Sequence, residues 1–362
     1  MSIFDYINKY GDYFFEDEEF NEVDNVILSV LSYIDFDGIV FNNKKRISIR
    51  EAGEIYFKIH YKKEKNITGV RNAIEIFKSI YTKKRYGNLL LYNYVYIGDD
   101  SQQFSAISID INNNITYVSF EGTDQLLSGW EEDFKMSYMF PVEAQRNAIR
   151  YINKYFTFSK KKLILGGHSK GGNLALVAGM CCNFVVRNRI INIYSNDGPG
   201  LRKTELESVR YKKIENKLVH IIPNYSIVGL LLRHGDNNRV ICSDKMGIYA
   251  HAVVSWIVDD NHFKDGNLSD MSKVLNDSVI VWLDKYNFSD RERFVKSLFD
   301  IFRKCNINNL IQFMDNKKLI FEFINKSNEL VADDKKMIMD FVSVFFECFK
   351  DYEIKKIKNK IN

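Results

Sequence analysis

A serine stands at the centre of a Gly-x-Ser-x-Gly pattern, Gly167-His168-Ser169-Lys170-Gly171. An apolar run precedes this pattern, and small and apolar residues follow it, which predicts a buried strand, a tight turn and a helix. On such a turn the serine backbone is strained, and side chains in place of the flanking glycines would collide across the junction. The chemistry that this arrangement favours is nucleophilic attack by the Ser169 hydroxyl.

A serine hydroxyl is a weak nucleophile at neutral pH, so it needs a general base within hydrogen-bond reach. The chain offers six histidines. In sheets that carry this kind of turn, the chain order is serine, acid, histidine, and the histidine follows the last strand. His251 lies after the last strand pattern and before Trp256, so it is the predicted base. His234, in a loop earlier in the chain, is the alternative.

The predicted acid, which would orient the base, is Asp197. It ends the strand pattern that follows the serine helix and directly precedes Gly198-Pro199-Gly200, so its carboxylate would lie at the same sheet edge as Ser169. A purely structural interpretation stays open, because aspartate before glycine also forms simple turns. Asp236 and Asp244, after the next strand, are the alternative acids.

The negative charge that develops on the attacked oxygen needs backbone N–H donors. Lys170 directly follows the serine at the expected helix start, so its main-chain N–H is one candidate. Gly122 or Thr123 supplies the second, because they lie in a glycine turn at the end of another strand pattern. The Thr123 hydroxyl could add a side-chain bond or simply cap the helix that follows.

The elements expected to position these residues alternate between strands and helices. Three strand patterns separated by turn residues predict an antiparallel meander, and the later strands are separated by helices, which implies parallel crossovers. We therefore expect an α/β-hydrolase fold, with a doubly wound, mostly parallel sheet and N-terminal helices. The expected strands are 89–97, 104–111, 115–120, 163–165, 190–194 and 217–222, and the expected helices include 24–33, 70–81 and 142–156.

Two further regions are defined by their apolar content. The stretch 124–141 predicts either a helix packed on the core or a flap over Ser169 that contacts an acyl chain. From residue 267 onward only helical patterns occur, which predicts a division into an α/β-hydrolase domain, 1–263, and a helical C-terminal region, 264–362. That region could cap the site, hold a partner or mediate a homo-oligomer.

Charge, cysteine content and apolar runs indicate which partners and which cellular location to expect. The net charge is +4, from 51 basic and 47 acidic residues, so no nucleic-acid partner is expected. Five cysteines without metal-ligand spacing fit reduced thiols, and we expect neither a metal nor a cofactor. The sequence has no run of eighteen apolar residues and no signal-peptide pattern, so a cytoplasmic protein without a transmembrane segment is expected.

With these residues in place, the sequence resembles a bacterial lipase-like family of α/β-hydrolases, long catalogued as a domain of unknown function and distantly similar to class 3 lipases. The resemblance extends over residues 1–263. The motifs that carry it are Glu19-Phe20-Asn21-Glu22-Val23-Asp24, Leu31-Ser32-Tyr33, Phe120-Glu121-Gly122-Thr123-Asp124, Trp130 with Asp133, Pro141-Val142-Glu143-Ala144-Gln145, Gly167-His168-Ser169-Lys170-Gly171-Gly172-Asn173-Leu174-Ala175, Asp197-Gly198-Pro199-Gly200, Ser226-Ile227-Val228-Gly229, and His251 followed by Trp256.

The resemblance implies a serine esterase or lipase, with Ser169 as nucleophile, His251 as base and Thr123 in the place of an oxyanion residue. Two positions depart from class 3 lipases. Glu121 stands where those enzymes commonly have arginine, and Ser226 occupies the frame that supplies their acid. The second departure favours Asp197, one strand earlier.

The predicted function is therefore hydrolysis of a small-molecule acyl ester or a lipid through an acyl-serine intermediate. A thioesterase or acyltransferase is one alternative, because the same three residues serve either acceptor. A catalytically silent hydrolase-fold binding module is the other.

Overall fold

An eight-stranded sheet forms the centre of the computed structural model. The structure describes residues 1–42, 45–59, 68–98, 103–123, 127–236, 238–309, 313, 316–341 and 343, without the side chains of residues 68 and 128. The strands are β1 (Ile47–Ser48), β2 (Leu90–Gly98), β3 (Gln103–Asp110), β4 (Ile115–Phe120), β5 (Lys162–His168), β6 (Ile190–Asn196), β7 (Leu218–Pro223) and β8 (Asn238–Ile241). A separate small hairpin pairs β9 (Val258–Asp259) with β10 (His262–Phe263).

The strands lie side by side in chain order, from β1 to β8. β1 to β4 pair antiparallel, so the predicted meander is confirmed, and β4 to β8 pair parallel. The mostly parallel sheet of an α/β protein is confirmed as well. The prediction that it is doubly wound is wrong, because a doubly wound sheet reverses its strand order at a switch point and this one never does.

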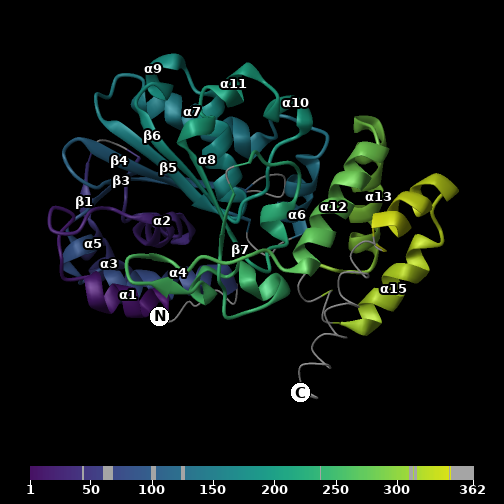
Figure 1. The fold of residues 1–362 in the computed structure, drawn as a ribbon, viewed down its shortest axis with the longest axis horizontal. Helices are drawn as coiled ribbons and strands as arrows, with labels where there is room; N and C mark the ends of the chain where they lie inside the picture. The colour runs from purple at the N-terminus through teal and green to yellow at the C-terminus, as the bar shows by residue number, and fades with distance from the viewer. Residues whose placement is uncertain are drawn as a thin grey trace.

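Helices nevertheless cover both faces of the sheet (Figure 1). Successive right-handed crossovers in one direction place their helices on the same face, here α7 (Glu143–Phe156), α8 (Lys170–Cys181) and α9 (Phe184–Arg187). The other face is covered by the N-terminal helices α1 (Ile3–Tyr10), α2 (Glu22–Ser29) and α4 (Thr68–Ile80).

Side chains that alternate along the strands divide the interior into two cores. On β5, Ile164 belongs to the core under the N-terminal helices, whereas Leu163 and Leu165 belong to the core under α7 and α8. On β4, Tyr117 and Val118 are divided in the same way. Each strand that leads to the candidate site is therefore buried on both faces, which fixes its register.

The N-terminal helices are fixed to the sheet by buried polar contacts. The Asp24 carboxylate on α2 lies 2.6 Å from Arg85 Nη2 and accepts a hydrogen bond from the Tyr86 hydroxyl. Next to it, the Asn25 side-chain amide donates to Asn196 Oδ1 at 2.9 Å, at the carboxyl end of β6. Asn25, directly after the acidic motif that ends at Asp24, therefore connects α2 to the strand that ends beside Asp197.

The helical patterns 24–33 and 70–81 are confirmed by α2 and α4, although α2 ends earlier and a 3₁₀ helix follows it. Sequence reasoning missed β1, which is only two residues long, β8, the hairpin of β9 and β10, and the helices α1 and α3 (Ile49–Ile59). The remaining short helices are α5 (Lys84–Gly87), α10 (Lys203–Leu206) and α11 (Val209–Lys212), with 3₁₀ helices at Leu31–Tyr33, Glu215–Lys217, Val228–Leu230, Gly247–His251 and Val253–Ser255.

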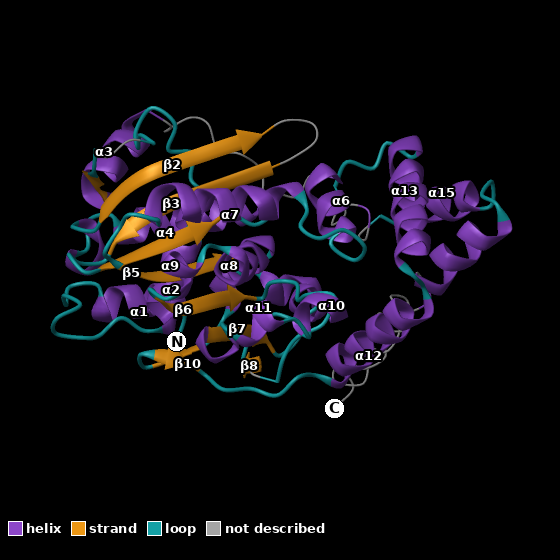
Figure 2. Cartoon of the chain, turned by 90° about the horizontal axis from the view of Figure 1, so that it is seen from above, coloured by secondary structure: helices purple, strands orange, loops and turns teal. Residues whose placement is uncertain are grey.

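A third core joins the C-terminal helices to the rest of the chain. The helices are α12 (Asp270–Lys285), α13 (Phe288–Lys304) and α15 (Lys317–Ser327), and they pack with α6 (Leu127–Lys135), the helix within the predicted flap. Figure 2 shows the arrowheads of β5 and β6 directed toward α6 and these helices. Because this core contains residues from both sides of position 263, the division at 263/264 stays a prediction.

Candidate active site

Ser169 occupies the turn between β5 and α8, with φ 58° and ψ −135°. This backbone conformation is strained for a residue with a side chain. A Cβ on Gly171 would lie 2.1 Å from the Phe120 carbonyl oxygen, and one on Gly167 would lie 2.2 Å from the Gly171 backbone. The glycines are therefore needed for the close approach of β4, β5 and α8, as the sequence pattern predicts.

The Ser169 hydroxyl makes no hydrogen bond within the described part of the chain, and the residue is 6% exposed. Its backbone N–H donates to the Asn196 carbonyl oxygen at 2.9 Å. This bond holds the serine turn against the last residue of β6, directly before Asp197.

Asp197 and His251 are brought together at this edge of the sheet. Asp197 is fully buried, and its Oδ2 lies 2.5 Å from Nδ1 of His251. The His251 side chain is 20% exposed, and its Nε2 has no hydrogen-bond partner among the described residues. A histidine held through Nδ1 presents Nε2 as the basic nitrogen, which is the tautomer that a general base requires.

The second oxygen of the Asp197 carboxylate is also satisfied. Oδ1 accepts a hydrogen bond from the Ser226 hydroxyl at 2.5 Å and another from the Gly229 backbone N–H at 3.1 Å. Ser226 is the residue in the frame where class 3 lipases carry their acid. Here it contacts the carboxylate that comes from one strand earlier, a role that sequence reasoning missed.

His168, the residue before the serine, supports the His251 loop. Its Nε2 lies 2.8 Å from the His251 carbonyl oxygen, and the two rings are 4.4 Å apart. On its other side, Nδ1 lies 3.3 Å from the Tyr33 hydroxyl. Burial is the main cause, and the neighbouring His251 the second, that lowers the pKa of His168 to about 3, so this ring is neutral at physiological pH. Only the family motifs had singled out this residue.

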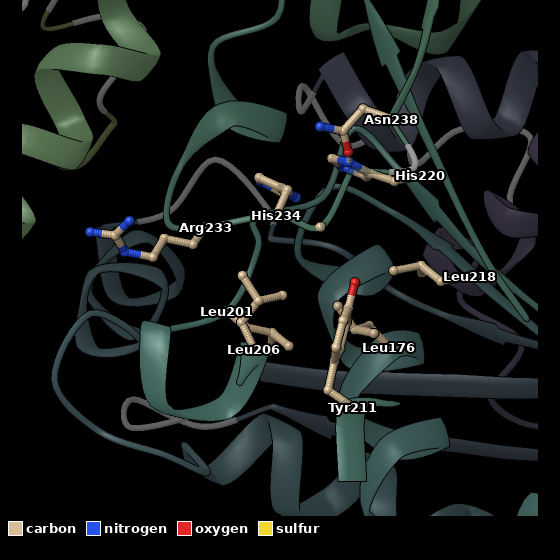
Figure 3. A pocket seen from close by; sticks show the side chains of 10 residues that line it. Leu176, Leu201, Leu206, Tyr211, Leu218, His220, Arg233, His234 and Asn238 are labelled. Atoms are coloured by element: carbon tan, nitrogen blue, oxygen red, sulfur yellow. Dashed lines mark hydrogen bonds between the residues drawn. The ribbon is translucent and has the colours of Figure 1, made fainter. Parts of the chain in front are cut away.

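His234, the alternative base, lies in a different environment. Its ring stacks on His220, with centroids 4.2 Å apart, and the two line a small cavity (Figure 3). His220 Nε2 lies 3.1 Å from the Gly198 carbonyl oxygen, so this pair supports the loop after Asp197. The alternative acids Asp236 and Asp244 are exposed. His60, another of the six histidines, lies outside the described residues.

The predicted oxyanion residues surround Ser169. A Cβ on Gly122 would lie 3.0 Å from the Ser169 Cβ, so the glycine turn after β4 directly faces the serine. Within the described residues, the backbone N–H groups of Thr123 and Lys170 donate no hydrogen bond. The Thr123 hydroxyl donates to Asp133 Oδ2 at 2.6 Å, so it is not a free donor. These N–H groups are available to an anionic oxygen.

A buried ionic network lies behind these donors. The Lys170 ammonium is 2.5 Å from Glu132 Oε2 and 3.9 Å from Asp133 Oδ1. Burial disfavours the ammonium, but the carboxylates of Asp133 and Glu132 outweigh burial and raise the pKa of Lys170 above its ordinary value. Burial also raises the pKa of Asp133 to about 6. The Lys170 side chain therefore has a role that its backbone position did not predict.

Helix α6 carries both acidic residues, and the C-terminal helices hold its opposite side. The Phe134 ring lies 5.5 Å from that of Phe299 on α13, and Glu131 pairs with Arg303. The structure therefore supports the core-packing interpretation of the predicted flap for its described residues, 127–141, and residues 124–126 lie outside the described part.

Two features are absent from the described residues. They contain no group of three or more histidine, cysteine, aspartate or glutamate side chains that could hold a metal ion. None of their helices combines the length and apolar character needed to cross a membrane.

Comparison with known proteins gives one family. A family model described as Mbeg1-like matches residues 80–300, from the last residue of α4 into α13, a range that includes Ser169, Asp197 and His251. No curated protein matches the chain. Among solved structures, the chain is similar to that of M37 lipase, with 14% sequence identity and a TM-score of 0.37 over 59% of this chain and 70% of the other.

Proposed function

The chain belongs to the Mbeg1-like family, and we propose that it is a serine hydrolase of the α/β-hydrolase fold that cleaves carboxylic esters of lipid or acyl type. The observation that carries this proposal is the pairing of His251 with the buried Asp197, 2.5 Å apart, at the sheet edge where Ser169 occupies a strained turn. These three residue types at one edge support nucleophilic catalysis.

In the proposed reaction, His251 Nε2 accepts the proton of the Ser169 hydroxyl while the oxygen attacks the ester carbonyl carbon. Asp197 holds the ring through Nδ1 and stabilises the imidazolium that forms. Collapse of the tetrahedral intermediate releases the alcohol, which takes its proton from His251. Water then attacks the acyl-serine by the same sequence of steps, which releases the acid and restores Ser169.

The charge on the tetrahedral oxygen would be stabilised by the backbone N–H groups of Lys170 and Thr123, with Gly122 allowing the close approach. Lys170 is the first residue of the 12-residue helix α8, so its backbone N–H lies at the positive end of the helix dipole. Removing one such donor from an enzyme typically costs about 10²–10³-fold in kcat.

An apolar acyl group is supported by exposed residues that closely precede the proposed base in the sequence. Met246 directly precedes the 3₁₀ helix that ends at His251 and is 38% exposed, and Tyr249 lies within this helix and is 56% exposed. The same three catalytic residues would serve a thioester or an acyl acceptor other than water. A silent binding module is less well supported, because a strained serine costs about 1–3 kcal/mol and has no use in a site without chemistry.

The experiment is hydrolysis of p-nitrophenyl esters of increasing acyl length by the full-length protein and its Ser169→Ala variant. We expect hydrolysis by the wild type and a loss of about 10³-fold or more in the variant. Chain-length preference separates a lipase from a short-chain esterase, and acyl-CoA hydrolysis tests the thioesterase alternative. A wild-type protein that hydrolyses none of these esters, or a Ser169→Ala variant as active as the wild type, would contradict the proposal.

A further inference from the structure

A second cavity lies at the junction between the α/β part and the C-terminal helices. It has a volume of about 420 Å³. One wall comes from the segments after β6 and β7, with Arg202, Lys203 and Arg233, and the other comes from the end of α12 and the start of α13, with Lys285 and Arg291. Both views show α10 and α12 on the two sides of this junction (Figures 1 and 2).

The lining of this cavity is strongly basic. It contains five cationic side chains and one carboxylate, that of Asp284. Asp284 pairs with Arg233 at 2.5 Å, and two carboxylates from outside the lining pair with two more of the cations, Glu205 with Arg202 at 2.6 Å and Asp340 with Lys285 at 2.5 Å.

Two of the five cations, Arg291 and Lys203, therefore have no ion-pair partner among the described residues. Arg291 donates instead to two backbone carbonyl oxygens, that of Ser137 at 2.7 Å and that of Leu283, and its buried Nε has no partner. The local excess of charge is two positive units.

Three arginines, two from one wall and one from the other, line this cavity. The guanidinium groups of Arg202 and Arg291 lie 4.8 and 5.2 Å from the centre of the Phe288 ring. The pKa of Arg291 is lowered, mainly by burial and next by the positive charge of Arg202. The charge of Arg233 lowers it further. Cations arranged in this way repel one another, and an anion placed between them would remove that repulsion.

We propose that this cavity binds a phosphate monoester. A phosphate monoester carries a charge of about −1.5 to −2 at pH 7, which matches the two unpaired cations. Arginine is the side chain best suited to phosphate, because its planar fork of donors matches two phosphate oxygens. The cavity is within the range of about 300–1,000 Å³ typical of small-molecule sites, so it admits an organic group as well. Phe288, Leu232 and Leu283 supply an apolar wall for that group.

The test is isothermal titration calorimetry of the full-length protein with phenyl phosphate, at neutral pH and low salt. We expect saturable binding that weakens as salt increases. Benzenesulfonate, which has a single charge, should bind several-fold more weakly. Arg291→Gln should weaken phenyl phosphate binding by about tenfold or more, because it removes a charge-assisted contact.

The matched control is Arg293→Gln on the same helix. Arg293 pairs with Asp334 at 2.8 Å and does not line the cavity, so its replacement should leave the affinity unchanged within twofold. If Arg291→Gln does not fold, the exposed Lys203→Gln replaces it, with an expected loss of about threefold. Absence of wild-type binding at about 1 mM phenyl phosphate, or equal losses in Arg293→Gln and the cavity variants, overturns the proposal.

The phosphate could belong to a soluble molecule or to a lipid headgroup, and two arms separate these sources. Full-length protein is sedimented with phosphatidylcholine vesicles that contain or lack phosphatidic acid. Sedimentation that requires phosphatidic acid and is reversed by phenyl phosphate identifies a headgroup. Phenyl phosphate binding without sedimentation identifies a soluble monoester. Sedimentation that Arg291→Gln leaves unchanged contradicts the proposed site.

Discussion

The His251 side of the candidate site and its Thr123 side are held by different kinds of contact. On the His251 side, the buried Asp197 carboxylate accepts hydrogen bonds from His251, Ser226 and the Gly229 backbone, all within segments that follow the sheet strands. On the Thr123 side, the supports are the buried salt bridge of Lys170 with Glu132 and the bond from Thr123 to Asp133, and both acids lie on α6.

The difference matters because α6 is not part of the sheet. Its opposite side packs on α13 through Phe134 and Glu131, so both acids on the oxyanion side are held by a helix that rests on the C-terminal helices. The acid–base side also contacts these helices, through Ile227 in the third core, but its polar contacts to Asp197 come from segments that follow strands. One half of the site is therefore built on segments that follow strand ends. The other half depends on long-range packing and on buried charge, which is costly to disturb.

The largest expected effect breaks the His251 side. Asp197→Asn removes the negative charge and the preference for the correct histidine tautomer, so we expect kcat for ester hydrolysis to fall by about 10³–10⁴-fold with the fold intact. The controls are Asp236→Asn and Asp244→Asn, which change exposed carboxylates and should leave kcat unchanged. If either control loses activity and Asp197→Asn does not, the acid is assigned wrongly.

Glu132→Gln breaks the Thr123 side. It leaves the Lys170 ammonium buried, with only Asp133 at 3.9 Å, so the free energy of unfolding should fall by about 3–5 kcal/mol in urea titrations. Glu131→Gln is the matched control on the same helix, and its surface pairs with Lys135 and Arg303 are worth about 1 kcal/mol or less. Equal losses in the two variants would show that the buried pair has no special role.

The Thr123 side should also make the stability of the protein depend on pH, through Asp133. The pKa of Asp133 is raised from 3.8 to about 6 by burial, so its neutral form is favoured in the folded protein. The stability gained in this way is fully present below pH 3.8 and is lost as the pH rises through about 6. The difference in unfolding free energy between the wild type and Asp133→Asn should therefore fall by about 2 kcal/mol from about pH 4.5 to about pH 7.5. A difference that is constant over this range would contradict the raised pKa.

Local sequence patterns predict much of the fold, including most strands of the sheet and the turn that carries Ser169. The serine turn and the meander follow from glycine spacing and alternation over a few residues. The strand order does not, because the same alternation of strands and helices fits a sheet that reverses its order and one that does not. A two-residue strand such as β1 is too short to leave a periodic pattern.

The supports of the site were less predictable than its central residues. The places of Asp197 and His251 after strands predict them as acid and base, and these catalytic roles stay predictions. Ser226 contacts Asp197 across 29 positions of sequence, and Glu132 contacts Lys170 across 38. Charged residues on a helix usually face solvent, so nothing in the local pattern of α6 distinguishes Glu132, which is buried, from its neighbour Glu131.

The role of Ser169 as nucleophile can be tested by mass spectrometry of the full-length protein after treatment with a fluorophosphonate. We expect one covalent adduct per chain, located on Ser169, absent in Ser169→Ala and formed much more slowly in His251→Ala. A wild-type protein that stays unmodified, or an adduct on any residue other than Ser169, would contradict this role.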